Sequence, residues 1–340
     1  MGIKALRKKW KSIFFGVLIA LSAQTAMALG QIDDEAGWGF KLYLNLGYGS
    51  SQSQFDTDSE NAITPDLRSS GEKINDTSVF PLGRLDYTLS NLKTQFFLGQ
   101  SGENIVRGQN QLEVGFAHML GQKEFLELAY FPQLLGPADT WKDPFVIGKK
   151  RKKTDQSARG FRVRWKNALD TPFTLRYGYV SIDIDDELSG QFLGLSQSQR
   201  SKLERNGDYH RLSGEYRIFH NDTSKITPVL SYTRGNTDGG AVGYDGFRIG
   251  VEGDHVFRER HATSLFLAYE QRKHLESNPV FGKKQKDNQL RVTATYSYLA
   301  PFGWKRARII ALARYRRSTS SISFYETKGA AISIGLGWEY

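Results

Sequence analysis

The sequence predicts an all-β protein, a transmembrane antiparallel β-barrel of about 14 strands (12 to 16 are compatible with the pattern), with short periplasmic turns and long extracellular loops. Three observations predict this fold. The chain starts with an export signal, its segments alternate between apolar and polar residues with a period of two, and short connections alternate with long ones.

Residues 1–28 have the features of a secretory signal peptide. Five basic residues precede an apolar run at 13–23, and the small-x-small pattern Ala26-Met27-Ala28 follows. The run is too short to span a bilayer as a helix, which disfavours the alternative of an uncleaved N-terminal anchor. We therefore expect export through the Sec pathway, cleavage after Ala28, and a single barrel domain over 29–340 in the outer membrane of a Gram-negative bacterium.

The composition of the 340 residues excludes several other classes. The absence of cysteine rules out disulfide scaffolds, thiolate zinc sites, iron–sulfur clusters and cysteine nucleophiles. A charged fraction of 24% and a mean hydropathy of −0.47 exclude a polytopic helical membrane protein, and 13% aromatic residues argue against disorder. After cleavage, 41 of the 46 basic residues remain with all 36 acidic ones, so the net charge falls from +10 to +5.

The strand prediction rests on strict alternation at both ends of the mature chain. Apolar residues occupy every second position from Trp38 to Tyr48 and again from Ile332 to Tyr340, with small or polar residues between them. Segments with the same pattern lie at 38–50, 78–89, 92–100, 110–120, 124–131, 159–167, 172–182, 208–219, 225–234, 244–257, 262–273, 287–299, 305–317 and 328–340.

The connections predict the barrel. Short turns near 90–91, 121–123, 168–171, 220–224, 258–261 and 300–304 alternate with longer connections near 51–77, 101–109, 132–158, 183–207, 235–243, 274–286 and 318–327. Hydrocarbon cannot satisfy backbone amides, so a sheet in a membrane must close on itself. The alternative is a soluble secreted sandwich or propeller, whose strands would average about 5–6 residues.

The last strand ends in aromatic residues. Trp338 and Tyr340 lie at the end of the alternating segment, and a C-terminal aromatic resembles the signal that barrel-assembly machinery recognises. We therefore expect that machinery as a partner. Outer-membrane lipid and lipopolysaccharide are the other partners that the predicted location implies, and nucleic acid is not expected.

Several loop and loop-edge stretches resemble a bacterial outer-membrane family known as domain of unknown function 2860. They are TQFFLG at 94–99, DPF at 143–145, GKKR at 148–151, ELSGQ at 187–191, LGLS at 193–196, RNGD at 205–208, NPVFGKK at 278–284 and PFGW at 301–304. The resemblance spans essentially the whole mature chain. It implies the barrel fold and carries no activity, cofactor or cargo.

If the apolar face of each strand contacts lipid, the opposite face lines the lumen and is rich in bases. It carries 14 bases and 6 acids, and the candidate lumen-lining arginines are Arg84, Arg162, Arg164, Arg176, Arg211, Arg217, Arg248, Arg291, Arg308, Arg314 and Arg316. The acids are Asp86, Glu113, Glu127, Glu215, Glu252 and Glu270.

This surplus supports two readings. A basic lumen inside a low-dielectric wall favours a porin-like channel for small solutes, with an anionic solute as its cargo. Alternatively, the arginines pair with carboxylates and form a plugged structural or surface-interaction barrel without conductance. The sequence leaves open whether the loops at 132–158 and 183–207 block the mouth.

Three loop features have structural or functional readings. The basic run at 149–153 suits either lipopolysaccharide phosphates or simple solvation. The acids between Asp183 and Glu187 fail as a Ca²⁺ loop because Leu188 stands where the sharp-turn glycine is needed. A short helix is expected at 196–205, with Ser196 and Gln199 as a capping box and Gly207 as its stop.

The histidines give no basis for an enzyme, and we predict no catalytic residues, cofactor or metal. His118, His210 and His255 fall on the lipid-facing side, while His220 and His261 fall in short turns. His274 alone is expected at the outer rim, where solvation is the usual state. No nucleophile–histidine–acid set can be assembled from the pattern.

Overall fold

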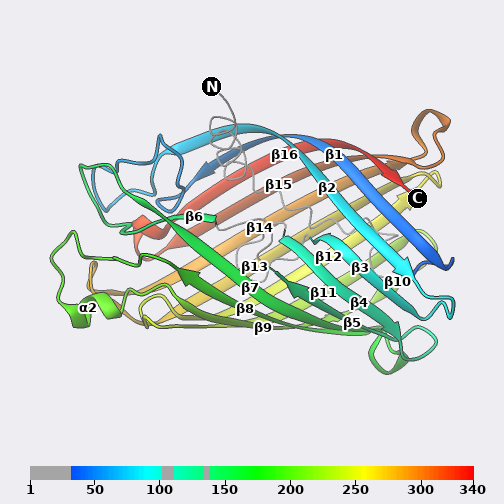
Figure 1. Cartoon of the computed structure of the whole chain (residues 1–340), viewed down its shortest axis with the longest axis horizontal. Helices are drawn as coiled ribbons and strands as arrows, with labels where there is room; N and C mark the ends of the chain where they lie inside the picture. Colours follow the sequence, from blue (N-terminus) through cyan, green and yellow to red (C-terminus); the bar gives the residue numbers. More distant parts are fainter. Residues whose placement is uncertain (1–31, 102–110, 133–137) are drawn as a thin grey trace.

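The computed structural model describes residues 32–101, 111–132 and 138–340, and these form a closed antiparallel barrel of 14 long strands (Figure 1). The barrel strands are β1 (Gly37–Gln52), β2 (Lys73–Thr88), β3 (Thr94–Ser101), β4 (Gln111–Met119), β5 (Phe125–Phe131), β7 (Lys153–Lys166), β8 (Phe173–Ile184), β9 (Gly207–Tyr216), β11 (Ser224–Thr237), β12 (Tyr244–Phe257), β13 (His261–Asn278), β14 (Lys283–Leu299), β15 (Ala307–Ser320) and β16 (Thr327–Glu339). Two short strands, β6 (Ala138–Trp141) and β10 (Phe219–His220), pair at the edges of β7 and β11. The predicted fold and all fourteen predicted strands are confirmed.

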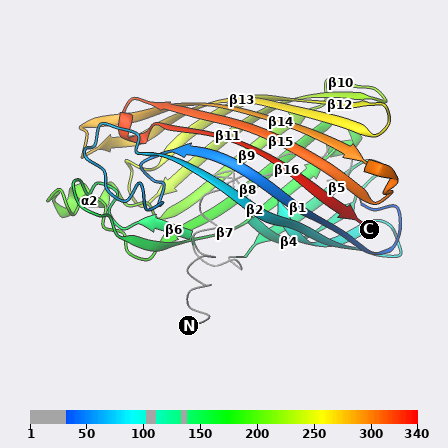
Figure 2. The ribbon, with the colours of Figure 1, turned by 90° about the horizontal axis from the view of Figure 1, so that it is seen from above.

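The barrel closes because its first and last strands pair. β1 and β16 run antiparallel in a continuous register from Lys41 opposite Glu339 to Gln52 opposite Lys328. The cartoon viewed from above shows β15, β16 and β1 lying side by side (Figure 2). Each long strand thus has a neighbour on both sides and the ring is closed; along β2, the pairs described with β3 run from Arg84 to Thr88.

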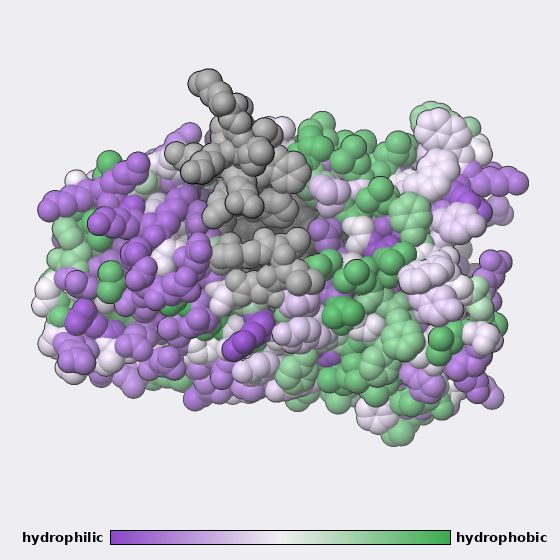
Figure 3. All heavy atoms as spheres, viewed as in Figure 1, coloured by the Kyte–Doolittle hydropathy of each residue, from purple (hydrophilic) through white to green (hydrophobic). Residues whose placement is uncertain are grey.

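The exposed face of the strands is the apolar one, as the alternation predicts. Along β1, Leu42, Leu44 and Leu46 are 47, 60 and 53% exposed, whereas Asn45 and Gly47 between them are buried. Figure 3 shows apolar side chains gathered in a belt over the half of the barrel that carries the C-terminus. Such a belt would be unfavourable in water, so it identifies an outer-membrane barrel surrounded by lipid. Within the described ranges, no helix has both the length and the apolar character needed to cross a bilayer.

Short turns connect the strands at the end where the C-terminus lies. Several of them place non-glycine residues in the left-handed backbone region, among them Leu92 at φ 54°, Arg258 at φ 51° and Ala300 at φ 50°. The turn after β7 contains the 3-10 helix η1 (Ala168–Asp170), and the turn after β14 contains η2 (Pro301–Gly303). These tight connections match the predicted short-turn side.

At the other end, strands extend beyond the apolar belt, and this corrects the predicted loop lengths. The connection expected at 274–286 is only the turn at 279–282, because β13 and β14 continue as a paired hairpin. β2 and β7 likewise begin five or six residues before the predicted segments. The outer surface of this half is hydrophilic in Figure 3, which explains why an apolar alternation could not detect it.

The helix expected at 196–205 is shorter than predicted. α2 covers Gln197–Ser201, and the predicted capping box between Ser196 and Gln199 is present. Gly207 does not stop this helix. It is the first residue of β9 and has φ 140°.

The inward face is less polar than predicted. A buried apolar cluster on the inner wall comprises Phe97, Ala129, Phe131, Val180, Ile182, Ile184, Tyr209 and Tyr244. On β8, Val180, Ile182 and Ile184 share the face of Arg176, so the alternation itself places apolar residues on the inward face of this strand. The interior therefore has an apolar side as well as a charged one.

Candidate functional site

Part of the predicted lumen-lining set forms a buried ion-pair wall on β4, β5 and β7. Arg162 contacts Glu113 at 3.0 Å and Glu127 at 2.6 Å, and Arg164 lies 3.8 Å from Glu127. All four side chains are at most 8% exposed. We call these four residues the ion-pair wall, and their geometry is that of a structural network.

Other predicted arginines also contact carboxylates. Arg84 lies 2.7 Å from Asp86, Arg176 lies 2.8 Å from Glu215, and Arg308 lies 3.0 Å from Glu339. Glu270 accepts hydrogen bonds from Arg248 and from Arg272, which the sequence reading had not placed in the lumen. The pairing reading thus describes these positions.

Two further predicted arginines bind neutral oxygens. Arg211 donates from Nε to the hydroxyl of Thr233 at 2.8 Å. Arg217 follows the end of β9 and lies 3.5 Å from the amide oxygen of Asn167, near the short turns.

The remaining three predicted arginines gather on β14 and β15. Arg291 lies directly opposite Arg316 in the strand register, and Arg314 follows on the same face two residues away. Arg291 donates to the Gln289 side chain at 3.3 Å. We call Arg291, Arg314 and Arg316 the basic wall.

The acids described on the same face of β14 and β16 contact other residues. Asp287 contacts His274 and Gln285, and Glu339 contacts Arg308 and Tyr43. Like charges placed opposite each other in a sheet are unfavourable, so the Arg291–Arg316 pairing does not itself stabilise the sheet.

Small residues line the neighbouring strands β16 and β1. A Cβ on Gly335 would lie 2.1 Å from the Asn45 side chain, and one on Gly337 would lie 2.1 Å from the Tyr43 ring. Glycine at these positions lets the two larger side chains lie flat against β16. Further along the barrel, Gly49, Gly329 and Ala331 leave open space beside the basic wall.

The outer mouth is spanned by loops that pack into one hydrophobic core, which we call the cap. Its buried residues and those packed against them come from six connections: Phe55, Leu67, Phe145, Leu193, Leu195, Leu203, Ala241, Val280, Phe281, Ile322, Phe324 and Tyr325. Phe145 and Phe324 stack with ring centroids 5.2 Å apart, although their loops follow strands far apart in the ring. Loops from opposite sides therefore meet over the mouth.

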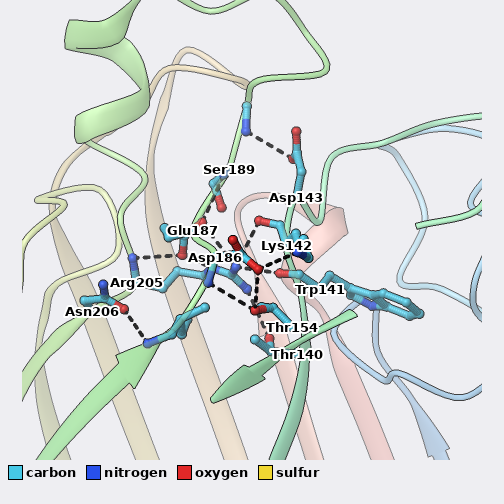
Figure 4. Close-up of polar contacts among 12 residues, drawn as sticks. Thr140, Trp141, Lys142, Asp143, Thr154, Asp186, Glu187, Ser189, Arg205 and Asn206 are labelled. Carbon is cyan, nitrogen blue, oxygen red and sulfur yellow. Dashed lines mark hydrogen bonds and ion pairs between the residues drawn. The ribbon is translucent and has the colours of Figure 1, made fainter. Parts of the chain in front are cut away.

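Polar contacts tie the cap to the β6–β7 and β8–β9 segments (Figure 4). Arg205 contacts Glu187 at 2.5 Å and donates to the Trp141 carbonyl at 2.6 Å. Asp143 accepts hydrogen bonds from the backbone amides of Gly190 and Phe192 at 3.1 and 2.9 Å.

The predicted acidic group at 183–187 serves this cap. Lys142 contacts Asp186, and it holds the pKa of that exposed carboxyl below its usual range through a hydrogen bond. Among the described residues, no group of three potential metal-binding His, Cys, Asp or Glu side chains is found.

One residue of the basic run at 149–153 is not solvated. Arg151 is 3% exposed, donates to the backbone carbonyls of Gln54 and Asn61, and lies 4.5 Å above the Trp141 ring. Burial lowers its pKa to about 10, which leaves it cationic at neutral pH. The four lysines of the run are exposed, so only Arg151 anchors the cap and the rest of the run lies at the surface.

His274 does not lie at a solvated rim, contrary to the expectation. It is 8% exposed, its Nδ1 lies 2.9 Å from the Ala241 carbonyl of the cap, and its Nε2 lies 3.3 Å from Asp287 of the barrel wall. Both ring nitrogens are engaged in joining the cap to the barrel.

A cavity of about 460 Å³ lies between the cap and the basic wall. Among the described residues, the basic wall, Arg205, Arg272 and Lys328 line this cavity together with the two acids Asp56 and Asp287. Arg205 also contacts Glu187, and Arg272 contacts Glu270. Apolar side chains, among them Ile182, Ile184 and Tyr209, line it from β8 and β9. The cavity is therefore amphipathic, with a cationic and an apolar side.

The C-terminal aromatics lie on the outer surface at the closure seam. Trp338 and Tyr340 are 45 and 66% exposed, and the Tyr340 and Phe40 backbones exchange two hydrogen bonds of 2.8 Å. Their recognition by assembly machinery stays a prediction.

Comparison with known families gives a match over nearly the whole chain. Residues 37–339 match the family described as protein of unknown function (DUF2860). A comparison with curated protein sequences finds no match.

Solved structures similar to this chain are outer-membrane barrels and channels of low sequence identity. OmpT, an outer membrane protein of Vibrio cholerae, has a TM-score of 0.44 and 10% identity, over 92% of this chain and 100% of the other. A Pseudomonas aeruginosa FadL homologue has a TM-score of 0.44 and 12% identity over 89% and 90% of the two chains. The monoaromatic hydrocarbon channel CymD has a TM-score of 0.44 and 6% identity over 90% and 89%.

Proposed function

The chain belongs to the DUF2860 family, and we propose that it is an outer-membrane channel that passes small solutes and favours anions. The observation that carries the proposal is the basic wall, where Arg291 and Arg316 oppose each other beside an open cavity. Like charges brought together inside a low-dielectric wall raise the local concentration of anions and repel cations.

The charge distribution in the barrel supports this role over a uniform structural network. In the ion-pair wall, acids and bases alternate within about 4 Å of each other, which cancels their field. At the basic wall, the neighbouring strands β16 and β1 contribute glycine, alanine and serine. The basic wall thus places three guanidinium groups where space for a solute exists.

The cap favours a second candidate, a plugged barrel without conductance. Its packed aromatic core covers the mouth, so passage through the channel requires the cap to loosen or to leave a path at its margin. A cap built from loops is among the least stable parts of a barrel, which makes such opening physically accessible.

Planar-bilayer recordings of the refolded protein in a KCl gradient test the proposal. We expect an anion-selective reversal potential that Arg316→Gln moves toward zero. Arg317→Gln is the matched control, because this neighbouring side chain is exposed on the outer face of the same strand, and it should leave selectivity unchanged.

Two results would overturn the channel. Cation selectivity would contradict the role of the basic wall. No conductance in the wild type or in Phe324→Ala, whose cap core is weakened, would favour the plugged barrel.

We also propose that the outer surface above the apolar belt contacts lipopolysaccharide phosphates. Lys273 lies directly opposite Lys286, and Lys284 follows on the same exposed face, beyond Tyr269 of the belt. A cluster of lysines at the height of the headgroups suits anionic phosphates. The double variant Lys273→Gln/Lys286→Gln should lose part of the thermal stabilisation given by lipopolysaccharide. An unchanged stabilisation would refute the contact.

A further inference from the structure

We infer that the cavity beneath the cap is a binding site for a small organic anion with an apolar body, such as an aryl or alkyl carboxylate. This inference rests on the proposed channel and specifies its substrate class. Three features carry it: a cationic side, an apolar side contributed by other strands of the same cavity, and a volume suited to a small molecule.

The cationic side is built from three adjacent arginines on rigid strands. Arg291, Arg314 and Arg316 all line the cavity, and Arg291 and Arg316 are directly opposite in the β14–β15 register. Guanidinium groups bind carboxylates through paired N–H donors, so such a cluster suits a carboxylate better than a single lysine would. The two acids on the lining have nearby polar partners, since Asp56 accepts from Ser51 at 2.7 Å and Asp287 contacts His274 at 3.3 Å.

The apolar lining comes from three strands. β8 contributes Ile182 and Ile184, β9 contributes Tyr209, and β12 contributes Tyr244. In the strand order six strands separate β8 from β16 in either direction, so Ile182 and Ile184 lie across the interior from β16, whereas only β13 separates Tyr244 on β12 from the basic wall. Phe55 and Tyr325 of the cap continue the apolar lining above them.

An apolar inner wall is unusual for a path that only conducts hydrated ions. Water and inorganic ions gain nothing from Ile182, Ile184 and Tyr209, and dewetting by apolar side chains opposes their passage. A solute with an apolar body buries that surface, while its anionic group meets the arginines. The volume of about 460 Å³ lies within the roughly 300–1,000 Å³ of small-molecule sites.

Calorimetric titration of the full chain in lipid nanodiscs tests the site, with empty nanodiscs as the blank. Three probes separate the contributions: 3-phenylpropionate has both charge and apolar body, 3-phenylpropan-1-ol has only the body, and sulfate has only the charge. We expect the carboxylate to bind at least about tenfold more tightly than either of the others, because each lacks one of the two contacts.

Substitutions on the cationic side and on the apolar side of the cavity should change probe binding differently. Arg314→Gln/Arg316→Gln should weaken 3-phenylpropionate binding about tenfold or more and leave the neutral alcohol unaffected. Ile184→Thr should weaken the carboxylate and the alcohol alike. The surface control Arg317→Gln should change neither, and retention of the heat-modifiable band on gels confirms that each variant is folded.

The outcomes distinguish this site from the channel. Equal binding of sulfate and 3-phenylpropionate, or no binding by any probe, would overturn the inference. If conductance is nevertheless anion-selective, the channel stands without this substrate class. Loss of both binding and selectivity would remove both proposals.

Discussion

The ion-pair wall and the basic wall both place arginines on the inward face of the barrel, but the residues around those arginines differ. In the first, Arg162 contacts two glutamates within 3.0 Å, and the group is almost fully buried. In the second, Arg291 lies opposite Arg316 beside open space. A lumen arginine is therefore not evidence of function by itself. Its neighbours across the strands decide whether it lies in a buried ion-pair network or lines a cavity.

The largest expected change in the free energy of unfolding comes from a substitution in the ion-pair wall. Glu127→Ala removes the carboxylate shared by Arg162 and Arg164 and leaves excess positive charge in a buried cluster. The free energy of unfolding should fall by about 3–5 kcal/mol. Urea unfolding followed by tryptophan fluorescence measures it. A loss below about 1 kcal/mol would mean that the wall is not a structural network.

The cap should be the next most sensitive region. Phe324 is fully buried between Phe55, Phe145 and Phe281, so Phe324→Ala should destabilise the closed cap by about 3–5 kcal/mol while the barrel stays folded. Limited trypsin digestion should cut faster at the exposed lysines 149, 150 and 152. Phe302→Ala, at a residue 78% exposed in a short turn, is the matched control and should leave the rate unchanged.

A smaller change in the free energy of unfolding, of opposite sign, is expected at the basic wall. Arg291→Gln removes a like-charge contact with Arg316, so unfolding stability should rise slightly, by less than about 1 kcal/mol. The same urea assay checks it. A loss comparable to that of Glu127→Ala would erase the distinction between the two walls.

The smallest effect is a pH response of the cap. Lys142 holds the pKa of Asp186 below its unfolded value of about 3.9. The contact therefore stabilises the cap fully above about pH 3.9, and this stabilisation is lost as the pH falls through the lower, folded-state pKa. Hydrogen exchange at 185–195 should increase modestly as the pH falls through that folded-state pKa. Asp186→Asn should abolish the response, and an unaltered response in that variant would assign it to another group.

Periodicity alone determined much of this protein. The alternation of Trp38 to Tyr48 identified an outward apolar face, and the alternation of turn lengths ordered the strands around the barrel. Both signals are local, because successive side chains of a strand point to opposite faces, so an odd or even position in the strand determines the face. Parity also indicated which arginines share the inward face, Arg162 and Arg291 among them.

Which inward arginines meet a carboxylate was decided by the tertiary structure. Strand register places Glu113 and Glu127 near Arg162, and it places Arg316 opposite Arg291. A shift of two residues in register keeps every side chain on its face but changes its partner, so the alternation alone does not determine these contacts. The alternation could not detect the cap either, since Phe145, Leu203 and Phe324 are isolated apolar residues in three separate loops. They become a core only when barrel closure brings those loops together, and that closure creates the amphipathic cavity beneath them.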